Sequence, residues 1–418
     1  MRATACSAPS RPPPLRFAVP GRPLAVVIAL SLAGLALHAP ARAGTPFTPA
    51  SDAEVVERLP GRGGDPALRQ VESLRRQLAA RPGDAALRLD VARRYFDLAM
   101  AQGDPRYVGY AAAAIGPLAS SDADNPAYWL LRGLIQQYSH DFPGAMLSLE
   151  RASALDPQAP EPVAWRAAIH MVQARYPQAL GECTRLVGLG QPLLARGCTA
   201  YAQAASGRLA GAYAGLKQAL DAAGPVEPAL ALWLRTRLAE MALRLQRPAE
   251  AEAHFRQALD TGVTDQFLLA AYADFLLRQQ RPAEAVRLLA DWERSDILLL
   301  RLALAGKALA HPKAADWAGQ LRERFAAAAL RGDKLHEQEA ARFALDIENQ
   351  PARALPLAQE NYQTQKEPRD AEMLMRAALA ASQAKAAQPA LDWFYASGYE
   401  DRALQALADR LVAAGATR

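Results

Sequence analysis

Apolar residues recur at helical spacing through most of the chain, in pairs of short runs. Ala251, Phe255 and Ala258 follow one another at four and three residues, which places them on one face of a helix. The preceding run, Leu232–Leu245, is also apolar at helical spacing. Pro248 stands between the two runs; it has no N–H and a fixed φ, so it suits the first turn of a helix and closes the helix before it. The pattern predicts a hairpin of two helices.

The hairpin pattern repeats along the chain. The stretch Arg-x-Gln-Arg-Pro-Ala-Glu-Ala occurs as Arg244–Ala251 and as Arg278–Ala285, at an offset of 34 residues. A small residue near the start of each second helix returns at steps of 33 to 39 residues, at Ala111, Ala145, Ala179, Ala212, Ala251, Ala285, Ala318, Ala354 and Ala390. A period in this range is typical of stacked repeat proteins. We therefore expect about nine hairpins.

The repeat resembles the tetratricopeptide repeat (TPR) family over residues 84–413. The best-matching copy carries the family's pattern of bulky and small residues at Trp129, Gly133, Ala145, Leu149, Ala152 and Pro157. The resemblance implies an all-α, right-handed superhelical solenoid of about nine helix-turn-helix repeats, with the first helix of each repeat on the concave side. A helical array of the HEAT or armadillo type is the alternative, although its period is nearer 40 residues or more.

The N-terminal residues 1–43 have the order of a secretory signal peptide. This segment has no acidic residue, and four of its arginines precede Leu24–Leu37, fourteen residues without a charge. Ala41-Arg42-Ala43 then has the small-x-small form of a cleavage site, so we expect cleavage after Ala43. The alternative is an uncleaved membrane anchor, but a span needs about 20 apolar residues. We expect a periplasmic or secreted protein without a stable membrane anchor after cleavage. The whole chain resembles exported bacterial repeat proteins of unknown function.

The remaining chain divides by composition. Residues 44–65 are interrupted by proline and glycine and are expected to form a flexible tether. Residues 66–83 predict an N-terminal capping helix, 84–400 the solenoid, and 401–418 a C-terminal capping helix, because the ends of a stack need a polar outer face.

The charge balance argues against nucleic acid as a partner. The chain has 48 Lys+Arg and 43 Asp+Glu, with a pI near 9.1. Five of the arginines and none of the acidic residues lie in residues 1–43, so signal removal leaves 43 of each sign. A chain without net charge and without a basic stripe is not expected to bind nucleic acid or an anionic membrane surface.

Two cysteines lie in the predicted mature chain. Cys183 occupies the bulky position of a second helix, and Cys198 lies in the first helix of the next repeat. In the family that the chain resembles, these two helices pack together, so the thiols could form a disulfide, and an even cysteine count in an exported protein favours one. The alternative is a pair of small buried core residues.

The chain shows no enzyme signature. Ser139-His140-Asp141 is contiguous, whereas catalytic triads are assembled in space, so we interpret it as a polar turn. His336-Glu337-Gln338-Glu339-Ala340 lacks the second histidine of a zinc protease motif. We therefore predict a non-enzymatic protein with no catalytic, cofactor-binding or metal-binding residues.

The candidate binding site is the concave groove that the resemblance implies. Its inward residues are expected to include Leu130, Leu134, Gln137, Tyr138, Tyr201, Glu240 and Asp274. Chaperone-binding members hold a peptide carboxylate at inward sites that carry Leu130, Leu134, Ala164 and Ala168 here, so that clamp is missing. Such a groove suits an extended or helical apolar segment of another protein. The alternative is that these residues only pack against neighbouring helices. We predict an interaction scaffold or assembly factor of the periplasm or cell envelope, or alternatively a holdase-like chaperone with broad peptide specificity.

Overall fold

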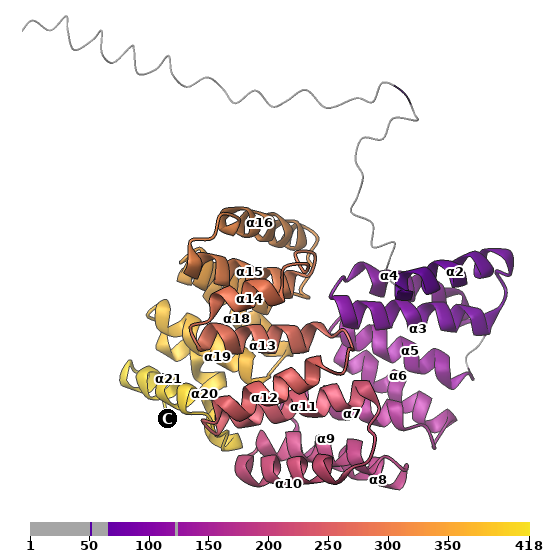
Figure 1. The fold of residues 1–418 in the computed structure, drawn as a ribbon, viewed down its shortest axis with the longest axis horizontal. Coiled ribbons are helices and arrows are strands. Elements are labelled where there is room, and N and C mark those ends of the chain that lie inside the picture. Colours follow the sequence, from indigo (N-terminus) through magenta and orange to yellow (C-terminus); the bar gives the residue numbers. More distant parts are fainter. Residues whose placement is uncertain (1–50, 52–65, 122–123) are drawn as a thin grey trace, which may run out of the picture. The chain divides into compact units, whose positions relative to one another are not determined.

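The protein is described here by a computed structural model that places residues 51, 66–121 and 124–418. Within these residues all regular structure is helical, in twenty α-helices, α2 to α21, and three short non-α turns (Figure 1). None of the helices in this part of the chain is long and apolar enough to cross a membrane. The predicted signal peptide and tether, Ser51 apart, lie outside the described residues.

The helices of the described residues pack in sequence as nine hairpins, in agreement with the predicted all-α solenoid. The first five are α3 (Ala85–Gln102) with α4 (Arg106–Ile115), α5 (Pro126–Tyr138) with α6 (Phe142–Leu155), α7 (Pro160–Val172) with α8 (Tyr176–Gly188), α9 (Pro192–Ala204) with α10 (Leu209–Ala222), and α11 (Pro228–Arg244) with α12 (Pro248–Leu259). A short turn, η1 (Gly116–Ala119), follows α4.

The other four hairpins follow the same order. They are α13 (Gln266–Arg278) with α14 (Pro282–Leu288), α15 (Asp296–Leu309) with α16 (Ala314–Leu330), α17 (Glu337–Arg342) and a π-helical turn η2 (Phe343–Ile347) with α18 (Pro351–Thr364), and α19 (Pro368–Ala380) with η3 (Ala384–Ala387) and α20 (Gln388–Ser397). Single helices stand at the two ends: α2 (Pro66–Ala80) falls within the predicted N-terminal cap and α21 (Arg402–Ala413) within the C-terminal cap.

The turns between the helices of a hairpin share one backbone conformation. His140, Ala174, Gln246 and Gln280 each adopt a φ between 56° and 61° directly after the first helix. The N–H of the following residue bonds to a carbonyl of the last helical turn, as from Arg175 to His170 at 2.8 Å. Such a left-handed residue ends a helix and satisfies its last carbonyls. The next helix then starts with proline, which has no N–H and so leaves no donor without a partner at that position.

The small residues of the repeat lie where the helices approach most closely. Eight of the nine predicted alanines are buried. Ala318 is the exception and is only partly buried. In that repeat the close contact is made by Gly306 of α15, which lies against Ala314 and the ring of Trp317. The register there is shifted because the tryptophan, rather than an alanine, fills the space between the helices.

Cys183 and Cys198 are joined by a disulfide, with their Cα atoms 5.5 Å apart. The bond links α8 to α9, so it connects the second helix of one hairpin to the first helix of the next. Both cysteines are buried in a small core cluster with Leu186 and Ala195. The disulfide therefore fixes two repeats relative to each other in the middle of the stack.

Two glycines give a matched test of the predicted close approach. A Cβ on Gly133 of α5 would lie 2.8 Å from Cγ of Leu149 and 3.4 Å from the carbonyl of Ala145. We expect Gly133→Ala to lower the free energy of unfolding by about 1–3 kcal/mol, because the packed helices must separate. A Cβ on Gly181 of α8 would meet no atom within 4 Å, so Gly181→Ala should raise the free energy of unfolding by about 0.5–1 kcal/mol. Urea unfolding followed by circular dichroism measures both; an equal effect of the two changes would contradict the close approach.

Candidate functional site

The four predicted groove residues of α5 belong largely to the core. Leu134 is fully buried, and Leu130 and Tyr138 pack partly buried against the same hydrophobic cluster. Gln137 is half-buried. Leu134 therefore supports helix packing and cannot contact a partner, which corrects its place in the predicted groove.

Tyr201 of α9 and Glu240 of α11 both contact the side chain of Arg237. The guanidinium of Arg237 lies 4.7 Å from the centre of the Tyr201 ring and forms an ion pair with Glu240 at 2.9 Å. Burial raises the pKa of Tyr201 above its ordinary value, so its hydroxyl keeps its proton. Both predicted groove residues are thus engaged with a neighbour on α11.

Asp274 of α13 is a structural residue. Its carboxylate pairs with Arg301 at 2.8 Å and with Arg342 at 2.9 Å. Burial alone would raise the pKa of Asp274, but the positive charges of Arg301 and Arg342 and the hydrogen bond from Arg301 lower it well below its ordinary value. Asp274 is therefore charged in the folded protein and held by two arginines, so it is not available to recognise a partner.

Asp274 belongs to a charge network that joins the first helices of four successive hairpins. Arg301 of α15 also lies 3.9 Å from Glu339 of α17. Arg342 of α17 continues the network to Asp346 of η2 at 3.6 Å, and Asp346 pairs with Arg376 of α19. Arg278 of α13 pairs directly with Glu372 of α19 at 3.4 Å. These side chains bind one repeat to the next along one side of the stack.

A second group of contacts joins residues far apart in the sequence; we call it the seam. It consists of contacts between residues 172–176, 207–209 and 244 and residues 366 and 393–400. The N–H of Lys366 donates to the carbonyl of Val172 at 2.7 Å. The indole N–H of Trp393 donates to the hydroxyl of Tyr176 at 2.8 Å.

Glu400 and Arg244 complete the seam. The carboxylate of Glu400 accepts a hydrogen bond from the N–H of Leu209, at the start of α10, at 2.7 Å. The carbonyl of Glu400 accepts one from Nε of Arg244 at 3.0 Å. The guanidinium of Arg244 lies 3.7 Å from the centre of the Tyr399 ring. The seam thus holds the last hairpin and the loop before α21 against the turns of the middle repeats.

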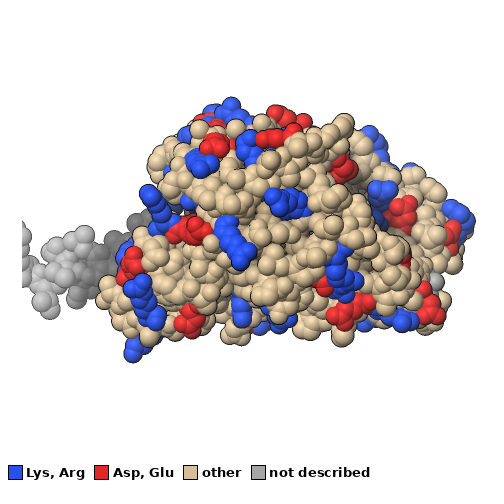
Figure 2. Space-filling view, turned by 90° about the horizontal axis from the view of Figure 1, so that it is seen from below, with Lys and Arg blue, Asp and Glu red and all other residues tan. Residues whose placement is uncertain are grey.

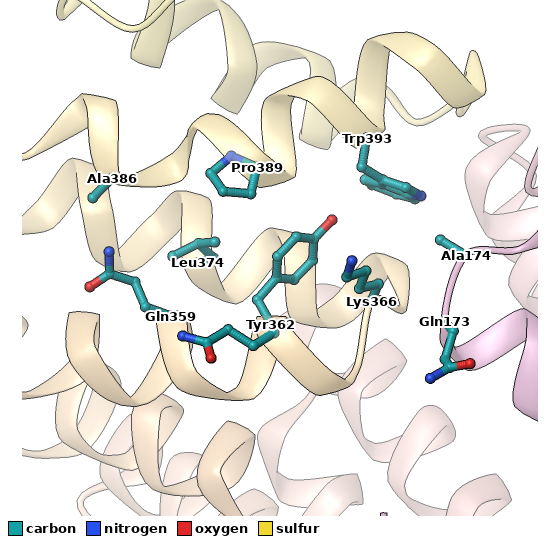
Figure 3. A pocket seen from close by; sticks show the side chains of 10 residues that line it. Gln173, Ala174, Gln359, Tyr362, Lys366, Leu374, Ala386, Pro389 and Trp393 are labelled. Carbon is teal, nitrogen blue, oxygen red and sulfur yellow. The ribbon is translucent and has the colours of Figure 1, made fainter. Parts of the chain in front are cut away.

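A cavity of about 630 Å³ opens beside the seam (Figure 3). Its walls come from the α7–α8 turn, α18, the α18–α19 loop, α19, η3 and α20. The apolar part of the lining consists of Ala174, the ring of Tyr362, Leu374, Ala386, Pro389 and Trp393, and the polar part consists of Gln173, Gln359, Gln363 and Lys366. This size and a mainly apolar lining with a few polar groups are typical of ligand sites. We take the cavity as the candidate functional site.

Tyr362 is the buried polar group of the cavity. Its side chain comes from α18, and Figure 3 shows its hydroxyl directed between Pro389, Lys366 and Trp393. The residue is 4% exposed, and its hydroxyl has no hydrogen-bond partner among the described residues. Burial raises the pKa of Tyr362 well above its ordinary value, so the hydroxyl is a donor at neutral pH. The hydroxyl oxygen is itself closed off within the wall, so Tyr362 presents its ring to the cavity as an apolar surface.

The polar residues of the α5–α6 turn, which resemble a catalytic triad in the sequence, have structural roles. Asp141 caps α6 by accepting a hydrogen bond from the N–H of Gly144 at 3.0 Å, and His140 is the left-handed residue of that turn. Across the placed residues, no three His, Cys, Asp or Glu side chains gather in a way that could hold a metal ion.

The sequence analysis missed the cavity. The residues that form its opposite walls lie about 185 to 220 positions apart, and their contact depends on how the whole stack curves. The only signal in the sequence was the pair of aromatic residues Tyr362 and Trp393, which helical spacing alone assigns to packing.

No protein-family model matches this chain, and no curated protein sequence matches it. Among solved structures, the type IV pilus biogenesis factor PilW is 21% identical and covers 51% of this chain and 98% of its own, at a TM-score of 0.36. Yeast Tom70 is 12% identical, over 83% of this chain and 84% of its own, at 0.40. The TPR domain of P58(IPK) is 14% identical, over 79% and 97%, at 0.25. What the chain shares with these structures is the stack of helical hairpins.

Replacement of Asp274 tests its structural role. Asp274→Asn leaves Arg301, which is 4% exposed, without a charged partner at hydrogen-bond distance. We expect the free energy of unfolding to fall by about 3 kcal/mol, because an uncompensated buried charge is strongly unfavourable. Asp221→Asn is the control, since Asp221 is exposed and pairs with Lys217 on the same helix; it should change stability by less than about 1 kcal/mol. Urea unfolding measures both, and a loss no larger than that of the control would show that Asp274 is free to serve recognition.

Proposed function

We propose that the protein is a non-enzymatic interaction scaffold or assembly factor of the bacterial periplasm or cell envelope, which binds a segment of a partner protein. Proteins built from TPR-like hairpins commonly mediate protein–protein interactions. The observation that carries the proposal is the seam cavity, a mainly apolar site on a helical frame. We place the bound segment there because Leu134 and Asp274 of the predicted groove are engaged in packing and ion pairs.

The surface charge supports a protein partner over a nucleic acid. Lysine and arginine are interspersed with aspartate and glutamate on the face in Figure 2. Nucleic-acid binding depends on a concentrated basic surface that neutralises several phosphates. The face in Figure 2 does not present such a surface.

The proposed compartment gives a test of its own. We expect the protein purified from the periplasmic fraction to begin at Gly44 and to show no thiol that reacts with iodoacetamide in urea until a reductant is added. Reduction should lower its free energy of unfolding by about 3 kcal/mol, because the disulfide closes a loop with a sequence separation of 15 residues. Intact-mass spectrometry and urea unfolding measure these quantities. Recovery from the cytoplasm with Met1 in place and reactive thiols would contradict the proposed export.

Site-specific photo-crosslinking in living cells tests the scaffold. A photoreactive phenylalanine analogue would replace Gln363, which is exposed at the cavity. The matched control would carry it at Gln218, which is exposed on α10 away from the cavity lining. A scaffold should give one crosslinked species of defined mass from position 363 and none from position 218, identified by mass spectrometry.

The other outcomes separate the alternatives. A broad set of unfolded proteins crosslinked at position 363 would favour the holdase-like chaperone. Equal crosslinking from both positions would place binding outside the cavity. The absence of any crosslinked protein at either position, with the variants folded and exported, would contradict both the scaffold and the chaperone.

A further inference from the structure

We propose that the seam cavity selects partner segments in which an acidic residue stands next to an aromatic residue. This inference rests on the proposed function, and it adds the chemistry by which a segment is recognised. The aromatic side chain would fill the apolar part of the cavity, the carboxylate would face Lys366, and the peptide main chain would meet the glutamine side chains at the rim.

The charge of the cavity gives the preference for an acidic residue. Lys366 is the only charged residue in the lining, which contains no aspartate or glutamate. Figure 3 shows its side chain directed into the cavity beside Tyr362. A carboxylate placed there gains an opposite charge and meets no acidic side chain of the lining.

The apolar walls give the preference for an aromatic residue. The rings of Tyr362 and Trp393 and the side chains of Leu374 and Pro389 come from three helices around one space. Aromatic rings bury a large area and pack favourably against other rings in offset or edge-to-face geometry. A single aromatic side chain therefore suits this space better than a small or charged one.

The polar rim gives the preference for a peptide. Gln173, Gln359 and Gln363 each carry an amide that both donates and accepts hydrogen bonds. A peptide main chain presents N–H and C=O groups that need both kinds of partner.

The seam holds the two walls in place before a segment binds. The hydrogen bond from Lys366 to Val172 fixes the main chain at the base of the lysine. The hydrogen bond from Trp393 to Tyr176 fixes the indole ring. A site that is already ordered loses less conformational entropy on binding.

Two isosteric peptides test the proposal. The probes are N-acetyl-Asp-Phe-amide and N-acetyl-Asn-Phe-amide, which differ only in a carboxylate and a carboxamide. We expect the Asp peptide to bind the chain of residues 44–418 about threefold or more tightly, the range of an exposed ion pair. Ligand-detected NMR titration measures both dissociation constants, and competition between the two peptides shows that they share one site.

Three variants locate the site. Lys366→Gln should abolish the preference for the Asp peptide and keeps the main-chain N–H that bonds Val172. Lys385→Gln removes the same charge from an exposed residue next to the lining, at η3, and should leave the preference intact. Tyr362→Phe keeps the ring that lines the cavity and removes only a hydroxyl that is closed off from it, so it should leave both affinities and the preference intact. Thermal unfolding of each variant confirms that it is folded.

Any one of four results would overturn the proposal. The two peptides could bind with equal affinity, or neither could show saturable binding. The preference for the Asp peptide could survive Lys366→Gln, or it could be lost on Lys385→Gln. If the peptides fail to bind while position 363 still crosslinks one partner in cells, the scaffold stands and the recognition chemistry is wrong. If the peptides bind as expected but no partner is crosslinked, the cavity chemistry stands and the scaffold fails.

Discussion

Helix ends carry main-chain groups without partners inside the helix, and this constraint explains the seam. No side chain of its own caps the start of α10, and the carboxylate of Glu400, 191 residues away, accepts the N–H of Leu209 there. The last carbonyl of α7, that of Val172, likewise accepts the N–H of Lys366. Each bond completes a helix of the middle repeats with a residue from the C-terminal part. The N–H of Leu209 and the carbonyl of Val172 therefore have these partners only when the stack is closed.

The seam closes the stack, and this changes how stability is distributed among the repeats. In an open repeat stack each unit contacts only its neighbours, and stability is approximately a sum of local terms. Here the ion pairs of Asp274, Arg301 and Arg342 set the packing of successive first helices, while the disulfide fixes α8 against α9. The seam adds contacts beyond neighbouring repeats, such as that of Trp393 with Tyr176, 217 positions earlier. Loss of packing in one repeat would therefore also affect the seam.

The sequence predicted what depends on neighbouring residues. The period of small residues identified the nine hairpins of the described chain and placed eight of nine alanines at close contacts, because helix packing within a hairpin is local. It placed Ala318 wrongly where Trp317 and Gly306 shift the register. The sequence could not show whether an inward side chain is free or held in an ion pair, as Asp274 is. The formation of such a pair depends on the angle between successive repeats. The seam cavity could not be predicted from the sequence for the same reason.

The position of the cavity connects binding to closure. Its lining includes Gln173 and Ala174 from one side of the seam and Lys366 and Trp393 from the other. A segment bound there contacts both sides at once, so it binds the closed stack better than an opened one. Binding and closure are thermodynamically linked. The ligand therefore stabilises the closed stack by the same free energy by which closure strengthens binding of the ligand. The same contacts that complete the helix ends therefore also bring the two sides of the cavity together.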